Sequence, residues 1–398
     1  MNRRPITDVD IYSDEMLDLP YDEFARMRSL GPAVWLDRYD MWAFPRYSQV
    51  RAALADWKTF SSGEGVGVEP EFNEIRRGTV IASDPPEHTK LRALFSERLS
   101  GRVMRELHEN IEARAEKLVD DLAARESFDA VGDFAEVFPV SLVADLIGLP
   151  LEERDKLLER SRGSFNAFGP KNKRGLETFH VFEDTKKYIS TYGTRDRLTP
   201  GSLGASLYEA ADRGELEPEQ VLPLMFSYLF PSLDTTVSAI GHAVWLLASH
   251  PEQWRTLKAE PSLIPAALEE ILRLESPVQF FARSLRADYD AEGTQMKAGD
   301  RVILMYGSAN RDDRKYVHPD RFDIRRNPVD HVAFGAGIHN CVGARLARAE
   351  VHALLGALVR RVDRIEAGPP MRRLNNSVRS LGSLPVVVHV GERVASYA

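Results

Sequence analysis

The run FGAGIHNCVG at residues 334–343 contains the only cysteine in 398 residues. Apolar residues recur at helical spacing through the following stretch, 344–355, so a helix is expected to begin close to Cys341. The positive end of that helix would stabilise a thiolate. Glycines carry no Cβ, so the backbone at positions 335, 337 and 343 could approach a large flat ligand closely. The run predicts a loop that offers a sulfur ligand to such a group.

An isolated cysteine is more often a small buried apolar residue than a ligand. Here the neighbouring residues argue against that interpretation, because the run fills every defining position of Phe-Gly-x-Gly-x-His-x-Cys-x-Gly. This pattern resembles the haem-binding signature of the cytochrome P-450 superfamily. The resemblance implies haem b with the Cys341 thiolate as axial ligand, and the haem contacts that it implies from the loop itself are Phe334, Gly335 and Gly343.

The composition fits one compact domain over residues 1–398, with 43% hydrophobic residues and no repeat or Pro/Gly/Ser-rich linker. No apolar run resembles a signal peptide or is long enough to span a bilayer without interruption. One unpaired cysteine fits a reducing compartment, and a net charge of −8 argues against nucleic acid as a partner. A cytoplasmic protein without membrane or nucleic-acid partners is expected, like the soluble bacterial P-450s.

Hydrophobic periodicity predicts a mainly α fold with minor β. Strands are expected at 33–36, 42–44, 301–305 and 385–390, and helices at 86–99, 102–125, 151–167, 218–250, 263–274 and 341–360. The P-450 fold, which this order resembles, holds haem between a long central helix and the helix after the cysteine loop. The 218–250 stretch is the candidate central helix.

An acid and two hydroxyls interrupt the apolar central stretch at PSLDTT, residues 231–236. Alone, Asp234 would face water and Thr235 would bond a carbonyl one turn back. The segment resembles the oxygen-activation motif of P-450s, which implies that Asp234 and Thr235 route protons to bound dioxygen. Pro231 and Ser232 depart from the motif's small residue and glycine. Pro231 lacks an amide hydrogen and clashes with the Ser227 carbonyl, so a kink or opened turn is expected there.

Glu270 and Arg273 stand one helical turn apart and can form an ion pair. They match the Glu-x-x-Arg of P-450s, in which a second arginine joins the pair and holds the segment before the cysteine loop. The resemblance points to Arg321, in Pro-Asp-Arg-Phe, as that arginine. All three are expected to be structural.

Four cationic or titratable side chains stand where P-450s bind the haem propionates. His88 and Arg92 are four residues apart on one expected helix face, Arg283 follows the Glu-x-x-Arg segment, and His339 is two residues before Cys341. Each alone would more often be an ordinary surface residue. Together with Cys341 they predict a propionate site.

The helix around 88–105 has a local excess of basic residues in an acidic chain: Lys90, Arg92, Arg98, Arg102 and Arg105. Such an excess is usually a solvated face. In P-450s the same helix borders the surface where an iron-sulfur protein docks, and no flavin or ferredoxin domain is present in this sequence. The resemblance implies electrons from a small acidic ferredoxin and its ferredoxin reductase.

Several aromatic residues fall in segments that converge on the distal pocket in P-450s, although such residues are more often plain core. They are Phe165, Phe168, Phe230, Phe280 and Phe281, beside the apolar Leu233, and Arg76, Arg77, Thr79 and Ser227 are candidates to bind a polar substrate group. These rings would narrow the pocket to a slot for one aromatic ring. Phe-x-x-Phe-Gly-Pro, Pro-Ser-x-Asp-Thr-Thr and Phe281 together resemble bacterial P-450s that O-demethylate methoxybenzoates and methoxyphenols. We expect a monooxygenase that removes methyl groups from lignin-type methoxyaromatics, with carboxylate and phenol both open.

Three other functions stay open at this level. The chain could hydroxylate another small hydrophobic substrate, such as a terpene, fatty acid or polyketide. A peroxygenase would use the same thiolate with hydrogen peroxide, although the Asp-Thr pair favours dioxygen. A haem-thiolate sensor is a third option, against which stands the lack of an output module in the sequence.

Overall fold

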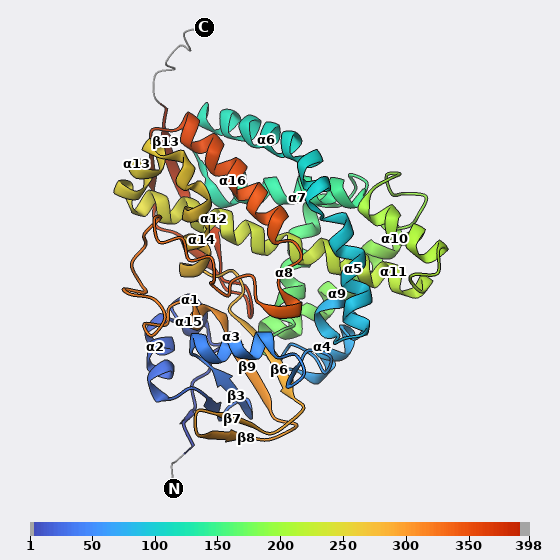
Figure 1. Cartoon of the computed structure of the whole chain (residues 1–398). Coiled ribbons are helices and arrows are strands. Elements are labelled where there is room, and N and C mark those ends of the chain that lie inside the picture. Colours follow the sequence, from blue (N-terminus) through green and yellow to red (C-terminus); the bar gives the residue numbers. More distant parts are fainter. Residues whose placement is uncertain (1–3, 391–398) are drawn as a thin grey trace.

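The computed structural model describes residues 4–390, apart from the side chains of Glu97 and Arg98, and combines a large helical part with a smaller part built around a sheet (Figure 1). The helices are α1 Asp14–Asp18, α2 Tyr21–Leu30, α3 Tyr47–Ala55, α4 Pro70–Ile75, α5 Glu87–Arg98, α6 Gly101–Ala123, α7 Val137–Ile147, α8 Leu157–Asn166, α9 Lys173–Tyr192, α10 Leu203–Asp212, α11 Val221–Leu229, α12 Asp234–Ser249, α13 Pro251–Ala259, α14 Ile264–Leu274, α15 Tyr306–Ala309 and α16 Ala344–Arg361. The strands are β1 Ile6–Thr7, β2 Val34–Leu36, β3 Met41–Phe44, β4 Phe60–Ser61, β5 Ser127–Asp129, β6 Phe280–Leu285, β7 Tyr289–Ala291, β8 Thr294–Met296, β9 Arg301–Met305, β10 Arg364–Ala367, β11 Met371–Arg373, β12 Ser380–Ser383 and β13 Pro385–His389. The expected class, mainly α with minor β, is confirmed.

The main sheet joins strands that are far apart in the chain, in the order β1-β2-β3-β9-β6-β4. The central strand β9 pairs in parallel with β3, where Trp42 stands opposite Val302, and antiparallel with β6, where Phe280 stands opposite Met305. Because side chains alternate along a strand, β6 presents Phe280 and Phe281 to opposite faces of the sheet. This alternation decides which of the two rings reaches the site.

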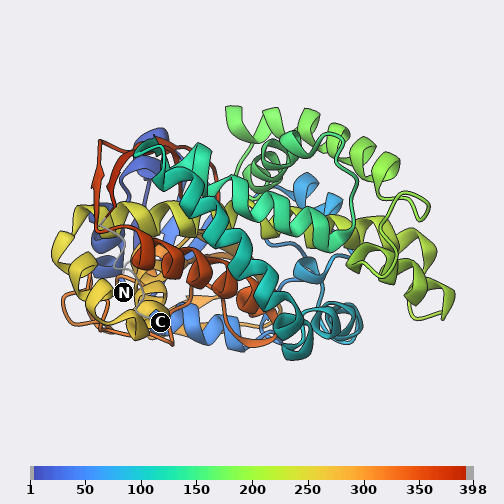
Figure 2. The same cartoon turned by 90° about the horizontal axis from the view of Figure 1, so that it is seen from above.

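The helical part packs around α12, whose side chains are buried over most of its length. Helices α16 and α6 lie side by side along one flank, and α14 also packs on α16 (Figures 1 and 2). Apolar residues of α6, α11, α12, α14 and α16 share one core. The cysteine loop enters this core from the sheet side and leads directly into α16.

The expected central helix 218–250 is divided, because the chain forms a short 3₁₀ turn at Pro218–Gln220 and a second at Phe230–Ser232 between α11 and α12. The opened turn predicted at Pro231 is confirmed, and it separates the expected stretch into α11 and α12. Proline cannot donate to a carbonyl one turn back, and the hydroxyls of Ser232 and Thr235 instead donate to the carbonyls of Tyr228 and Pro231. The sequence interpretation also missed helices α1, α2, α3, α4, α7, α9, α10, α13 and α15.

Candidate functional site

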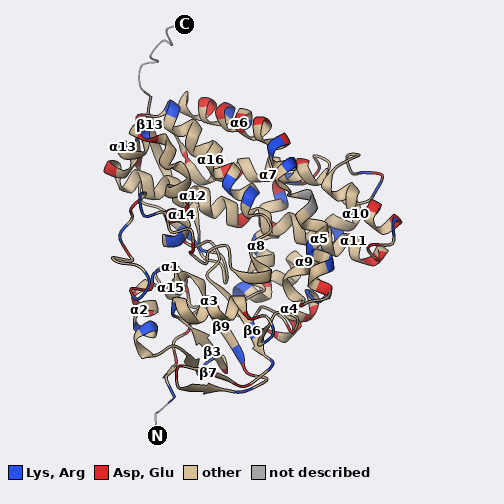
Figure 3. Cartoon of the chain, viewed as in Figure 1, with Lys and Arg blue, Asp and Glu red and all other residues tan. Residues whose placement is uncertain are grey.

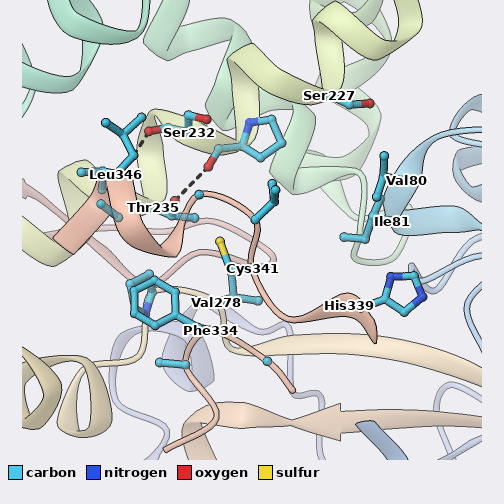
Figure 4. A pocket seen from close by; sticks show the side chains of 18 of the residues that line it. Val80, Ile81, Ser227, Ser232, Thr235, Val278, Phe334, His339, Cys341 and Leu346 are labelled. Carbon is cyan, nitrogen blue, oxygen red and sulfur yellow. Dashed lines mark hydrogen bonds between the residues drawn. The ribbon is translucent and has the colours of Figure 1, made fainter. Parts of the chain in front are cut away.

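One cavity lies between the cysteine loop and the junction of α11 and α12. Its walls come from six parts of the chain: residues 76–81, 92–99, 164–168, 226–239, 268–283 and 333–351, with Tyr306 from α15. Figure 4 shows Cys341 on one wall with its sulfur directed toward Thr235 on the opposite wall. A large flat cofactor and a small substrate could share this space.

Cys341 stands three residues before α16, and its own amide donates to the Phe334 carbonyl at 2.8 Å. The Cys341 sulfur opens into the cavity, and the Ala344 amide at the start of α16 donates to the Cys341 carbonyl at 3.4 Å. Burial raises the pKa of the Cys341 thiol, while the backbone amides of Gly343 and Ala344 and the charges of Arg92 and Arg348 act in the opposite direction. The predicted thiolate position at a helix start is thus supported by these amides.

Two glycines give the cysteine loop its shape. Gly335 and Gly337 have φ of 67° and 66°, which other residues rarely adopt. A Cβ on Gly337 would lie 2.2 Å from the Leu54 carbonyl oxygen of α3. Gly337 therefore lets the loop pack on α3, a role different from the close approach to a ligand that the sequence suggested, whereas Gly335 and Gly343 both line the cavity.

The cavity has a cationic end, which Arg92, Arg283 and His339 line. His88 and His339 contact each other edge to face at 4.4 Å, and neither Nε2 has a hydrogen-bond partner. Burial, followed by the charges of Arg283, His88 and Arg92, lowers the pKa of His339 to about 2. His88 and Arg92 likewise have lowered pKa values, with burial as the main cause. Unsatisfied donors and crowded positive charge at one end of the cavity fit the two propionates of haem.

Thr235 lines the cavity, and its hydroxyl donates to the Pro231 carbonyl at 2.9 Å. Asp234 does not line the cavity: it is fully buried and pairs through Oδ1 with Nε of Arg162 at 3.1 Å. Burial raises the pKa of Asp234, although the Arg162 charge opposes this. Arg162, on α8, also binds Glu136. The sequence pattern did not point to this arginine, because it lies 72 residues from Asp234.

The buried pair Glu270 and Arg273 forms two hydrogen bonds, at 2.7 and 2.9 Å. The prediction that Arg321 joins them is wrong, since its side chain is exposed and only its carbonyl faces Arg273. Arg326 contacts Glu270 instead, at 3.1 Å. A turn after residue 321 brings Arg326 back to Glu270 on α14. Spacing along the chain does not reveal this contact.

The predicted substrate residues divide into two groups. Phe165, Phe168, Phe281, Arg76, Thr79 and Ser227 line the cavity. The other four are placed elsewhere, and for these the sequence interpretation is wrong: Phe230 and Leu233 belong to the helical core, Phe280 packs on Tyr12 and Phe24, and Arg77 is exposed and pairs with Glu74.

Cavity residues that the sequence interpretation missed include Val80, Ile81, Phe95, Phe226, Tyr306 and Glu350. Each is locally indistinguishable from ordinary core. Phe226 could have been considered from the sequence. It stands four residues before Phe230, so the two rings share one helix face, and the spacing did not decide which of them lines the cavity.

A cavity-facing thiol just before a helix start, a cationic end and a hydroxyl at a kink between two helices define a haem-thiolate protein. The comparisons with known proteins agree. The family model "Cytochrome P450" matches residues 180–376. Cytochrome p450 CYP199A2 of Rhodopseudomonas palustris is 39% identical over 388 residues, covering 96% of this chain and 94% of that protein. Steroid C26-monooxygenase of Rhodococcus jostii is 31% identical, covering 93% of this chain and 81% of that protein.

Solved structures give the same result. CYP268A2 of Mycobacterium marinum, in complex with pseudoionone, superposes with a TM-score of 0.87 at 28% identity, covering 97% of this chain and all of that one. Cytochrome P450 CREJ, in complex with (4-ethylphenyl) dihydrogen phosphate, superposes with a TM-score of 0.84 at 26% identity, covering 96% of this chain and 99% of that one. The chain belongs to the cytochrome P450 family.

As a cytochrome P450 monooxygenase the protein binds haem through a cysteine thiolate and acts on a small molecule with electrons from redox partners. Within residues 4–390 no helix combines the length and apolar character needed to cross a membrane.

Proposed function

We propose that this monooxygenase removes the methyl group of small methoxybenzoates and releases formaldehyde. The observation that carries the proposal is a buried guanidinium in the cavity wall. Arg76 is 5% exposed, and no described carboxylate forms an ion pair with it. Its contacts are the carbonyls of Ser164 and Phe72, at 2.5 and 3.2 Å, and the face of Phe168, whose centroid is 4.0 Å away.

Burial lowers the pKa of Arg76 to about 9, because a buried cation without a neighbouring negative charge is unfavourable. A substrate carboxylate would provide the missing charge, and a guanidinium binds a carboxylate with two parallel hydrogen bonds. Thr79 and Ser227 line the same cavity and could each offer a hydroxyl. This combination favours a carboxylate over a phenol as the polar group of the substrate.

The rings that line the cavity support a flat substrate. Phe168 contacts Phe281 edge to face at 4.9 Å, and Phe165 lies 5.9 Å from Phe168. Tyr306 contacts the far side of Phe281 at 5.9 Å. These rings pack on one another and together give the cavity an aromatic wall, against which the ring of a flat substrate could pack. The aryl phosphate in complex with CREJ is likewise a single aromatic ring with an acidic group, bound to a protein of this fold.

Bound haem would supply the activation of dioxygen, with Cys341 as its axial ligand. The chain's own residues would do the rest: Arg76 orients the carboxylate, the rings exclude water, and Thr235 holds a hydroxyl proton above the sulfur. Insertion of one oxygen atom into a methyl C–H bond gives a hemiacetal, which collapses to a hydroxybenzoate and formaldehyde.

An external ferredoxin and its reductase are the proposed electron source. Exposed basic residues gather where α5, α6 and α16 meet, on the cysteine side of the molecule (Figure 3). The guanidinium groups of Arg105 and Arg345 both lie within 4 Å of where a side chain on Gly101 would point. Arg102 and Lys90 are exposed nearby in the chain, whereas the side chain of Arg98 lies outside the described residues. Such a surface would attract a small acidic protein.

A spin-state titration tests the substrate class, because a ligand that displaces water from haem iron shifts the Soret band. The compounds are 4-methoxybenzoate, its methyl ester, 4-methoxyphenol, a fatty acid and a terpene, followed by a formaldehyde assay with NADH, ferredoxin and reductase. We expect the largest shift and formaldehyde release from the benzoate. Preference for the ester or the phenol would contradict carboxylate binding by Arg76. Preference for the terpene or fatty acid would contradict the whole substrate proposal.

A further inference from the structure

Three asparagine side chains meet behind the cavity wall, and none of them lines the cavity. Asn166 ends α8, Asn172 precedes α9, and Asn376 lies between β11 and β12. Asn376 is fully buried, and its Nδ2 donates to the Asn166 carbonyl and to Asn172 Oδ1, each at 3.0 Å. Its Oδ1 accepts from Asn172 Nδ2 at 2.9 Å and from Arg174 Nε at 3.0 Å. The Asn376 amide group therefore uses both of its donors and both of its acceptor positions.

The approach of Asn376 to the chain after α8 requires a glycine. A Cβ on Gly169 would lie 2.6 Å from the Asn376 Cβ, closer than side-chain atoms approach each other. The backbone N–H of Asn376 also donates to Asn166 Oδ1 at 2.9 Å. The neighbouring Asn375 adds a hydrogen bond from its Nδ2 to the Arg162 carbonyl, at 2.9 Å. The segment that contains both asparagines therefore fixes the last turn of α8, from residue 162 to residue 166.

The end of α8 in turn contacts the arginine of the proposed substrate site. The Ser164 carbonyl accepts a hydrogen bond from Arg76 Nη2 at 2.5 Å. The ring of Phe168, two residues after α8, lies with its centroid 4.0 Å from the Arg76 guanidinium carbon. The position of the guanidinium in the cavity wall therefore depends on where the end of α8 lies.

The same segment is also joined to β6 and its aromatic ring. The Gln279 amide, just before β6, donates to the Ser377 carbonyl at 2.9 Å. Val378 packs in one small core with Phe168, and Phe281 of β6 packs against this core. Residues 375–378 thus connect the end of α8 with the aromatic wall of the cavity.

We propose that Asn376 is a positioning residue of the substrate site, which holds the end of α8 and thereby places the Arg76 guanidinium for a substrate carboxylate. Asn376 does not line the cavity, so it acts through other residues and not by contact with the substrate. The inference rests on the proposed function, because it requires a carboxylate bound at Arg76. An asparagine that only stabilised the fold would affect all substrates alike, whereas this role predicts a larger effect on the acid than on its neutral ester.

Spin-state titrations of the haem-loaded protein with 4-methoxybenzoate and its methyl ester test this role. We expect Asn376→Ala to weaken binding of the benzoate by about tenfold, because a displaced guanidinium loses part of a charge-assisted pair, and binding of the ester by less than about twofold. KM for the benzoate should rise while kcat stays near the parent value.

A second variant reaches the same contact from the other side. Gly169→Ala displaces Asn376 but keeps its amide group, so it should give the same pattern, and it replaces Asn376→Ala in the test if that variant does not fold. Asn110→Ala, at an exposed position of α6, is the control and should match the parent. Unchanged benzoate binding, or equal losses for acid and ester, would overturn the proposal.

A double-mutant cycle shows whether the effect passes through Arg76. Asn376→Ala should cause no further loss of benzoate binding in a protein that already carries Arg76→Leu, and additive losses would overturn the proposal. A parent protein that prefers the ester would contradict the proposed function and this inference together. A parent that prefers the benzoate and keeps that preference in Asn376→Ala and Gly169→Ala would contradict this inference alone.

Discussion

The two walls of the cavity are built in different ways. The cysteine wall is one continuous run, residues 334–343, in which Gly335 and Gly337 adopt left-handed conformations and the Cys341 amide binds the Phe334 carbonyl. The distal wall collects side chains from residues 76–81, 164–168, 226–235 and 278–281. The first wall is determined by local backbone geometry, the second by how separate elements pack. The general chemistry therefore belongs to the first wall and the choice of substrate to the second.

Replacing the sulfur ligand of the cysteine wall should have the largest effect on the activity. Cys341→His should keep a coloured haem protein but lose the reduced carbon monoxide band for which the family is named, because a neutral imidazole cannot push electron density as a thiolate does. Product formation should fall below detection. Spectra of the dithionite-reduced protein with carbon monoxide check this, and a variant that keeps the band would contradict the assignment of Cys341.

The distal wall is tested most strongly at Arg76. Arg76→Leu should weaken binding of 4-methoxybenzoate by about a hundredfold, since losing one partner of a buried charge pair costs about 2–5 kcal/mol. Binding of the neutral methyl ester should change little. Spin-state titrations of both compounds give the two affinities.

Arg77→Leu is the matched control, because Arg77 is exposed and paired with Glu74. It should bind the benzoate as the parent does. Equal losses in the two variants, or equal losses for acid and ester, would show that Arg76 acts through packing and not through charge.

Thr235 lies in the distal wall, but its expected role is in oxygen activation and not in the choice of substrate. Thr235→Ala should bind substrate and consume NADH, yet form about tenfold less product for each NADH, with hydrogen peroxide in its place, if its hydroxyl carries a proton. Thr235→Ser, which retains the hydroxyl, should keep most of the yield. An unchanged ratio of product to NADH in Thr235→Ala would remove Thr235 from proton delivery.

The smallest expected effect compares two neighbouring rings on β6. Phe281→Leu should weaken substrate binding by about tenfold, because Phe281 lines the slot. Phe280→Leu should leave affinity unchanged and lower the free energy of unfolding by about 1 kcal/mol, because Phe280 packs on Tyr12 and Phe24 in a separate core. Titrations and thermal unfolding measure the two. Similar affinity losses in both variants would contradict the separation of the two faces.

Motif residues were predictable to different degrees. Cys341 and its loop were recognisable because the chemistry requires defined residue types at short, constant spacing. The opened turn at Pro231 was predictable too, since a missing amide hydrogen acts on its own helix. Arg321 was a wrong prediction for the opposite reason: the arginine that reaches Glu270 is Arg326, and the course of the intervening turn decides between them.

The sequence by itself determined the class of this protein: a mainly helical cytochrome P450 with a thiolate loop, because that loop depends on glycine conformations and amide hydrogen bonds within ten residues. Only the tertiary structure decided which acid faces the cavity, which phenylalanine lines the slot and that Arg76 is buried in the cavity wall with no ion pair to a described carboxylate. Helical and strand spacing place a side chain on a face of its own element. Whether that face meets solvent, core or cavity depends on the elements packed against it, as Phe280 and Phe281 demonstrate within one strand.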